Sequence, residues 1–119
     1  MSNKPDISVS QRVLYSLRLD IINKKYKAGD QFPTVRSLAF DMSINPNTMQ
    51  KVLSLLEDEG LLVSKGTVGR FVTDDASAIE NARHELQREY MENAVKAAGE
   101  LGISKEQFIK YVTESEEMI

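Results

Sequence analysis

The chain contains no cysteine and a single histidine, His84, among its 119 residues. Without cysteine it can form no disulfide, no thiolate metal site and no cysteine nucleophile, and one histidine cannot build a histidine-rich metal site. The sequence also shows no Ser-His-Asp arrangement, no Walker-type loop and no GxGxxG motif. The acids Glu57, Asp58 and Glu59 follow one another instead of facing each other across a pocket. We therefore expect neither an enzyme nor a bound metal or cofactor.

Long apolar runs are missing as well. No uninterrupted run approaches the roughly 20 residues that a membrane-spanning helix needs. The first residues are polar and show neither a signal peptide nor an anchor. We therefore expect a cytoplasmic protein that makes no contact with a membrane.

Charge is divided unevenly along a chain whose 41% hydrophobic and 28% charged residues are typical of a globular protein. Residues 1–74 carry ten basic and eight acidic side chains, a balance of +2. Residues 75–119 carry five basic and ten acidic side chains, a balance of −5, which together give the net charge of −3. The acidity lies in the C-terminal tail, which is either a solvated helical surface or a surface for a partner.

Hydrophobic periodicity predicts three helices in the first half of the chain. Ser8 and Gln11 form a capping-box pattern before the first helix, and Thr34 can cap the second. Asn45 followed by Pro46 is a favourable start for the third, because proline lacks only an N–H that would be unpaired there. The residues expected to face the core are Val9, Val13, Leu14, Leu17, Ile21, Ile22, Val35, Leu38, Ala39, Met42, Met49, Val52, Leu53 and Leu56.

The pattern changes after Gly60, which is expected to end the third helix. Leu61–Ser64 and Arg70–Thr73 are typical of two short strands, and Lys65–Gly69 between them is a glycine-bearing hairpin loop. Three helices followed by a hairpin are the order of a winged helix-turn-helix. We expect a mainly α fold with a small β-hairpin, in which residues 8–74 form the winged helix-turn-helix and residues 75–119 form a two-helix C-terminal hairpin.

The tail shows a long apolar stripe. Side chains from Ile79 to Leu101 recur every three or four residues, and Ser104 with Gln107 repeats the capping-box pattern before a short last helix. Two helices cannot bury such a stripe by themselves, so it needs the winged domain, a second copy of the chain, or both. We expect a dimer interface formed by Ile79, Leu86, Tyr90, Ala94, Leu101, Phe108 and Val112.

Four segments together resemble the DNA-binding domain of GntR-family bacterial transcription regulators. They are Gly29–Ala39, with the sequence Gly-Asp-Gln-Phe-Pro-Thr-Val-Arg-Ser-Leu-Ala, then Asn45–Thr48, Glu59–Leu61 and Gly69–Val72. The Asn-Pro-Asn-Thr turn and the two-helix tail are similar to the small YtrA-like subfamily.

Three positions depart from the family pattern. Ala28 replaces the usual proline, Thr34 the usual serine, and Gly66 a basic residue that often begins the wing. Threonine can still cap a helix and donate its hydroxyl, so the second change is mild. The third leaves the basic contacts of the wing to Lys65 and Arg70.

The resemblance implies DNA contacts from three parts of the winged domain. Arg36 in the second helix is expected to bind a phosphate or a guanine edge, with a surface ion pair as the alternative. Asn47, Thr48 and Gln50 have no core role and are expected to read bases, whereas capping is an equal alternative for Asn45. The expected DNA-binding residues are Thr34, Arg36, Asn45, Asn47, Thr48, Gln50, Lys51, Lys65, Gly66, Gly69 and Arg70.

The sequence therefore predicts a transcription regulator that binds a double-stranded DNA operator as a homodimer. The small positive charge of one copy favours two half-sites in an inverted repeat. Repression is implied by the resemblance alone, and the sequence points to no particular small-molecule effector. The alternative is a winged-helix adaptor that binds a protein partner through the acidic tail.

Overall fold

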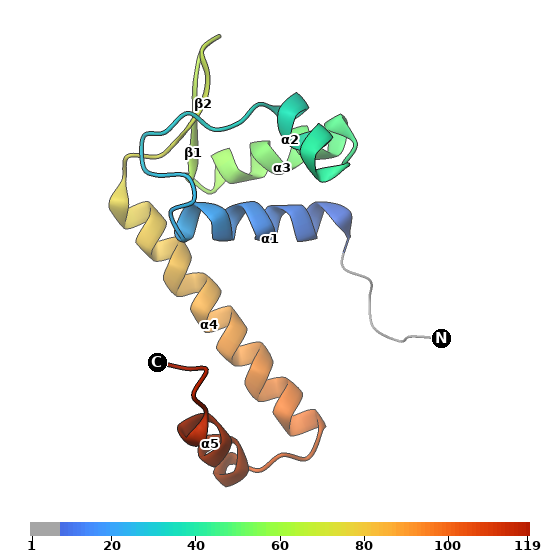
Figure 1. The fold of residues 1–119 in the computed structure, drawn as a ribbon, viewed down its shortest axis with the longest axis vertical. Helices are drawn as coiled ribbons and strands as arrows, with labels where there is room; N and C mark the ends of the chain where they lie inside the picture. Colours follow the sequence, from blue (N-terminus) through green and yellow to red (C-terminus); the bar gives the residue numbers. More distant parts are fainter. Residues whose placement is uncertain (1–7) are drawn as a thin grey trace. The chain divides into compact units, whose positions relative to one another are not determined.

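The computed structural model describes residues 8–119. Its elements, in chain order, are α1 (Val9–Ile22), α2 (Val35–Met42), α3 (Pro46–Asp58), β1 (Leu62–Lys65), β2 (Gly69–Val72), α4 (Ala76–Glu100) and α5 (Lys105–Glu114). Helices joined to one antiparallel hairpin confirm the mainly α fold with a winged helix-turn-helix and C-terminal helices (Figure 1). The chain divides into two compact units after Arg83, so the division falls inside α4.

The predicted caps are present at the starts of the first three helices. Ser8 and Gln11 form a reciprocal capping box on α1. The Thr34 hydroxyl accepts a hydrogen bond of 3.1 Å from the Ser37 N–H at the start of α2. The Asn45 side chain accepts one of 2.8 Å from the Asn47 N–H, with Pro46 in the first helical position of α3. These local hydrogen bonds fix the residues at which α1, α2 and α3 begin.

The core of the first unit lies between α1, α2, α3 and the hairpin. Figure 1 shows α1 running beside α3, and these two helices make extensive contacts. Contact with the core begins at Val13, one turn after Val9, which stays 53% exposed although its spacing suggested burial. The core is formed by Val13, Leu17, Ile21, Phe32, Leu38, Ala39, Met49, Val52, Leu53, Leu56, Leu61, Leu62 and Val72.

The hairpin is antiparallel and begins one residue later than the sequence suggests. Ser64 lies opposite Arg70, and Lys65 lies opposite Gly69, which are the last partners before the turn. The segment before α2 covers the outer edge of β2, since the Phe32 N–H donates to the Arg70 carbonyl oxygen at 2.8 Å. The wing is therefore attached on one side to the chain that leads into α2.

The first turns of α4 belong to the winged unit. Ile79 and Ala82 pack against its hydrophobic core, and the guanidinium of Arg83 donates to the carbonyl oxygen of Ile22. Asp75 starts the helix, because its carboxylate accepts hydrogen bonds from the Ser77 hydroxyl and the Ser77 and Ala78 N–H groups. The winged unit therefore includes two turns of the helix that the sequence assigned wholly to the tail.

The second unit consists of the rest of α4 and α5. Gly102, with φ of 74°, ends α4, and Ser104 with Gln107 caps α5 through the predicted capping box. Ala98 is the buried side chain of this unit. Most of its large apolar side chains are exposed, among them Tyr90, Met91, Val95, Leu101, Ile109 and Tyr111.

Candidate nucleic-acid interface

The start of α3 exposes a cluster of polar side chains. Met49 faces the core with no exposed surface, whereas Asn47, Gln50 and Lys51 are exposed and Thr48 is half-buried. The helical period explains this division, because residues on either side of a core position turn toward solvent. The amides of Asn47 and Gln50 and the hydroxyl of Thr48 can pair with base edges, and Lys51 can bind phosphate.

The start of α2 provides a second group. Arg36 lies exposed in the first turn, and Thr34 occupies the cap directly before the helix. The unpaired N–H groups of a helix N-terminus favour a negatively charged group, and arginine adds a planar donor that suits phosphate or guanine. Thr34 uses its hydroxyl oxygen to accept from Ser37, so capping is the role that its contacts show.

The tip of the wing provides a third group. The Lys65 ammonium lies 4.6 Å from the centre of the Phe71 ring, a cation–π contact that orients this exposed lysine. Gly66 and Gly69 have positive φ values of 54° and 129°, which shape the turn. Gln31 supports it by donating to the Val68 carbonyl oxygen at 2.9 Å. The sequence did not single out Val68, whose side chain is exposed at the tip.

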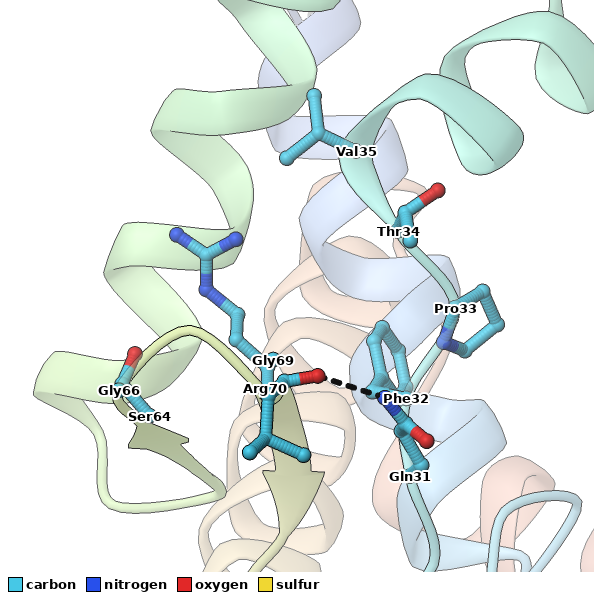
Figure 2. A pocket seen from close by; sticks show the side chains of 10 residues that line it. Gln31, Phe32, Pro33, Thr34, Val35, Ser64, Gly66, Gly69 and Arg70 are labelled. Atoms are coloured by element: carbon cyan, nitrogen blue, oxygen red, sulfur yellow. Dashed lines mark hydrogen bonds between the residues drawn. The ribbon is translucent and has the colours of Figure 1, made fainter.

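Arg70 is placed differently from the other predicted wing residues. Its guanidinium points toward α3 (Figure 2) and forms an ion pair with the Glu57 carboxylate. The Arg70 hydrogen bond is the main cause that lowers the pKa of Glu57 from its ordinary value of 4.5; burial opposes it and the Ser64 hydroxyl assists it. The sequence predicted Arg70 as a DNA contact, and the structure gives it a partner within its own chain.

A hollow of about 290 Å³ separates the wing from the start of α2 (Figure 2). Residues 31–35 line one side, and Ser64, Gly66 and residues 68–70 line the other. The structure therefore brings Thr34, Gly66, Gly69 and Arg70 around one space. Arg36 and the polar cluster of α3 do not line it.

The residues predicted for the dimer interface fall into both units. Ile79 packs on the core of the winged unit, so it already has apolar neighbours in its own chain. The other six, Leu86, Tyr90, Ala94, Leu101, Phe108 and Val112, belong to the second unit. Met91 and Val95, which the expected interface does not include, are also exposed on α4.

Residues 8–119 contain neither a metal-binding cluster nor a membrane-spanning helix. This part of the chain holds no group of three or more metal-ligating side chains close enough to bind an ion. Its helices include none with the length and apolar character needed to cross a membrane.

Similarity to known proteins agrees with this geometry. The family of bacterial regulatory proteins named gntR matches residues 9–72. The HTH-type transcriptional regulator YhcF of Bacillus subtilis (strain 168) is 31% identical over 110 residues, which span 92% of this chain and 88% of that protein. The HTH-type transcriptional repressor YtrA of the same organism is 27% identical over 89 residues, 74% of this chain and 68% of that protein.

A solved structure shares the fold over nearly the whole chain. The GntR family transcriptional regulator from Listeria monocytogenes superposes with a TM-score of 0.85 at 26% identity, covering 95% of this chain and 99% of that one. These relatives are regulators and not enzymes. The polar start of α3, the wing and these similarities lead to one conclusion: the chain belongs to the GntR family, as a DNA-binding transcription regulator of the YtrA-like kind.

Proposed function

We propose that the protein represses transcription as a homodimer that binds an inverted-repeat operator upstream of its own gene. The observation that carries the dimer is the apolar surface of the second unit. Tyr90 is 70% exposed and Leu101 is 79% exposed, with Met91, Val95, Ile109 and Tyr111 exposed nearby in sequence. Monomeric proteins rarely leave so much apolar surface in contact with water, because burying it is favourable.

A second copy of the chain is the occupant that fits this surface. An apolar helix face packed on the same face of an identical chain forms a two-fold interface in which each copy supplies the same residues. The side chains proposed for it are Leu86, Tyr90, Met91, Ala94, Val95, Leu101, Phe108 and Val112. We propose residues 75–119 as the dimerisation segment, with Ile79 and Ala82 also serving the winged core.

The charge of the winged domain favours the same arrangement. Residues 1–74 have a balance of only +2, so one copy neutralises few phosphates and should bind DNA weakly. A two-fold dimer presents two reading helices to two half-sites, spaced about one helical turn of DNA or a multiple of it apart. Linking the two binding events raises the overall affinity without new contacts.

Each winged domain is proposed to read one half-site through α3. Asn47, Thr48 and Gln50 would read base edges in the major groove, and Lys51 and Arg36 would bind phosphate or guanine. Thr34 and Asn45 would contribute through the helix starts that they cap. Lys65, Gly66 and Gly69 would bring the wing to the neighbouring minor groove.

Repression is the proposed outcome of binding. The similar protein YtrA of Bacillus subtilis (strain 168) is named a transcriptional repressor. A dimer seated on an operator that overlaps a promoter would block access of RNA polymerase. This mechanism requires no catalytic group and no cofactor.

Sedimentation and footprinting test the two parts of the proposal. The full chain should sediment at twice its 13.4 kDa mass, and it should protect an inverted repeat upstream of its gene from DNase I. Tyr90→Glu with Leu101→Glu should give a monomer that binds this site much more weakly, whereas Glu89→Lys, which lies among Glu85, Arg88 and Glu92 on the polar side of α4, should remain dimeric. A dimeric double variant would contradict the interface, and absence of any protected site would contradict the operator.

A further inference from the structure

Glu57, in the last turn of α3, faces both strands of the wing. Its carboxylate accepts a hydrogen bond from the guanidinium of Arg70 on β2, and the hydroxyl of Ser64 on β1 also helps to lower the pKa of Glu57. Ser64 and Arg70 lie directly opposite each other in the hairpin, so their side chains leave the same face. One carboxylate therefore pairs with Arg70 on β2 and faces Ser64 on β1.

Partial burial favours a defined geometry for this contact. The side chains of Arg70 and Glu57 are 20% and 29% exposed, which limits competition from water. Hydrogen bonds between ionised groups are stronger and more directional than those between neutral groups. The backbone of Arg70 is held as well, because its carbonyl oxygen accepts from the Phe32 N–H at 2.8 Å.

We propose that Glu57 and Arg70 form a clamp that fixes the wing relative to the reading helix α3. Arg70 is then a positioning residue for DNA binding and not a phosphate ligand. The inference rests on the proposed contact of α3 and the wing with DNA. The polar cluster Asn47–Lys51 occupies the start of α3, the clamp holds its end, and the wing tip at residues 65–68 lies beyond the clamp.

Preorganisation is the physical advantage of such a clamp. A wing that moved freely would lose conformational entropy on DNA, and this cost would weaken binding. A wing already held at Arg70 avoids much of that loss. The clamp therefore supports DNA affinity without contributing a charge contact of its own.

The two possible roles of Glu57, repelling phosphate or holding the wing, predict opposite changes in DNA affinity when its charge is removed. Removing an acid from a DNA-binding domain should strengthen binding if the acid only repels phosphate. If Glu57 holds the wing, Glu57→Gln should weaken binding despite the lost negative charge. The matched control is Glu59→Gln, two residues further along the chain. It removes the same charge, but from a carboxylate that pairs with Arg18 on α1 and not with the wing.

The probe is a duplex that the wild-type chain selects from a random-sequence library, titrated over a range of KCl concentrations. We expect Glu57→Gln and Arg70→Gln each to weaken binding about tenfold, the effect of losing one charge-assisted contact. The double variant should be no weaker than either single one, because both remove the same clamp. The slope of log affinity against log salt should stay at the wild-type value, and Glu59→Gln should bind at least as tightly as the wild type.

Amide hydrogen exchange of the free protein provides a second measurement. In both clamp variants the amides of residues 62–72 should exchange faster than in the wild type, and the exchange rates in α1 should be unchanged. A general loss of folding would speed exchange everywhere. Unchanged exchange in the hairpin would overturn the clamp. A second pattern would also overturn the clamp: the salt slope falls by about 0.9 in Arg70→Gln, and Glu57→Gln binds DNA normally or more tightly. That pattern is expected if Arg70 is a phosphate ligand. Failure of the wild type to select any sequence would contradict the DNA-reading role, while exchange would still decide the clamp.

Discussion

The guanidinium of Arg18 grips the carboxylate of Glu59 through two hydrogen bonds, of 2.9 Å from Nε and 2.6 Å from Nη2. This pair joins α1 to the end of α3, two residues beyond the carboxylate that holds the wing. Two acids at the end of α3 thus pair in different directions: Glu59, the residue that follows the helix, pairs with α1, and Glu57 pairs with the hairpin. The acidic run at residues 57–59 could be taken for a solvated helix end, but two of its carboxylates have partners within the chain.

Loss of the first of these pairs should weaken the fold without changing DNA recognition. We expect Glu59→Gln to lower the free energy of unfolding by about 1 kcal/mol, since the two-bond geometry is good but the pair remains partly exposed. Urea denaturation followed by circular dichroism measures the change. A variant as stable as the wild type would show that the pair contributes nothing to stability.

Base reading and phosphate binding should separate within α3. Asn47→Ala and Gln50→Ala should each cost about 1–3 kcal/mol on the preferred site and relax the preference at one base pair. Lys51→Ala should weaken binding to all sequences and lower the salt slope by about 1. Competition assays with single-base variants of the selected duplex distinguish these results, and an unchanged preference in Gln50→Ala would remove that residue from the reading set.

The cap of α3 allows the two roles of Asn45 to be distinguished. Asn45→Ala should lower the free energy of unfolding by about 1 kcal/mol, because the Asn47 N–H loses its partner, whereas Asn45→Ser retains a capping oxygen. Thermal unfolding measures the cap, and titration of the selected duplex measures DNA contact. If Asn45→Ser is stable but loses base preference, Asn45 also reads DNA; if it keeps both properties, capping is its whole role.

Backbone conformation should make Gly29 intolerant of a side chain. Its φ is +83°, and an added Cβ would lie 2.8 Å from Oδ1 of Asp74. The Asp74 side chain can move, but the backbone strain remains, so Gly29→Ala should cost about 1–2 kcal/mol. Gly99→Ala is the matched control, since Gly99 lies within α4 with nothing within 4 Å of its added Cβ. That control should be neutral or slightly stabilising, and an equal loss in both variants would contradict the argument.

The stability contributed by Glu57 should depend on pH. Arg70 lowers the pKa of Glu57 in the folded state, so the contribution is present above the ordinary pKa of 4.5 and disappears as pH falls through the lowered value. The difference in melting temperature between the wild type and Glu57→Gln should therefore shrink as pH falls below 4.5. Differential scanning calorimetry over acid pH checks this, and a difference independent of pH would exclude an ionic contribution.

Local features of this chain could be predicted from sequence and distant pairings could not. The caps at Ser8, Thr34 and Asn45 depend on residues two or three positions apart, and all were predicted correctly. The pairs Arg70–Glu57 and Arg18–Glu59 join residues 13 and 41 positions apart, so they depend on how helices and strands pack. For the same reason, sequence alone could not show that Arg70 has an acidic partner within its own chain.

The surface of α4 shows a second limit of sequence patterns. One stripe with a spacing of three or four residues includes Tyr90 and Leu101, which the structure leaves exposed. It leaves out Met91 and Val95, which are also apolar and exposed, because the apolar arc is wider than a single stripe. The strand ends also moved by one residue, since pairing of Lys65 with Gly69 extends the hairpin beyond its apolar run.

The alternation along α3 has a consequence for how such a protein can change over generations. Met49 is fully buried, while Asn47 and Gln50 on either side of it face solvent. Substitution of exposed helix positions usually changes stability by less than about 0.5 kcal/mol. If these positions read bases as proposed, a gene duplicate could acquire a different target sequence through them while its fold stays intact, so recognition and folding could evolve almost independently on one helix.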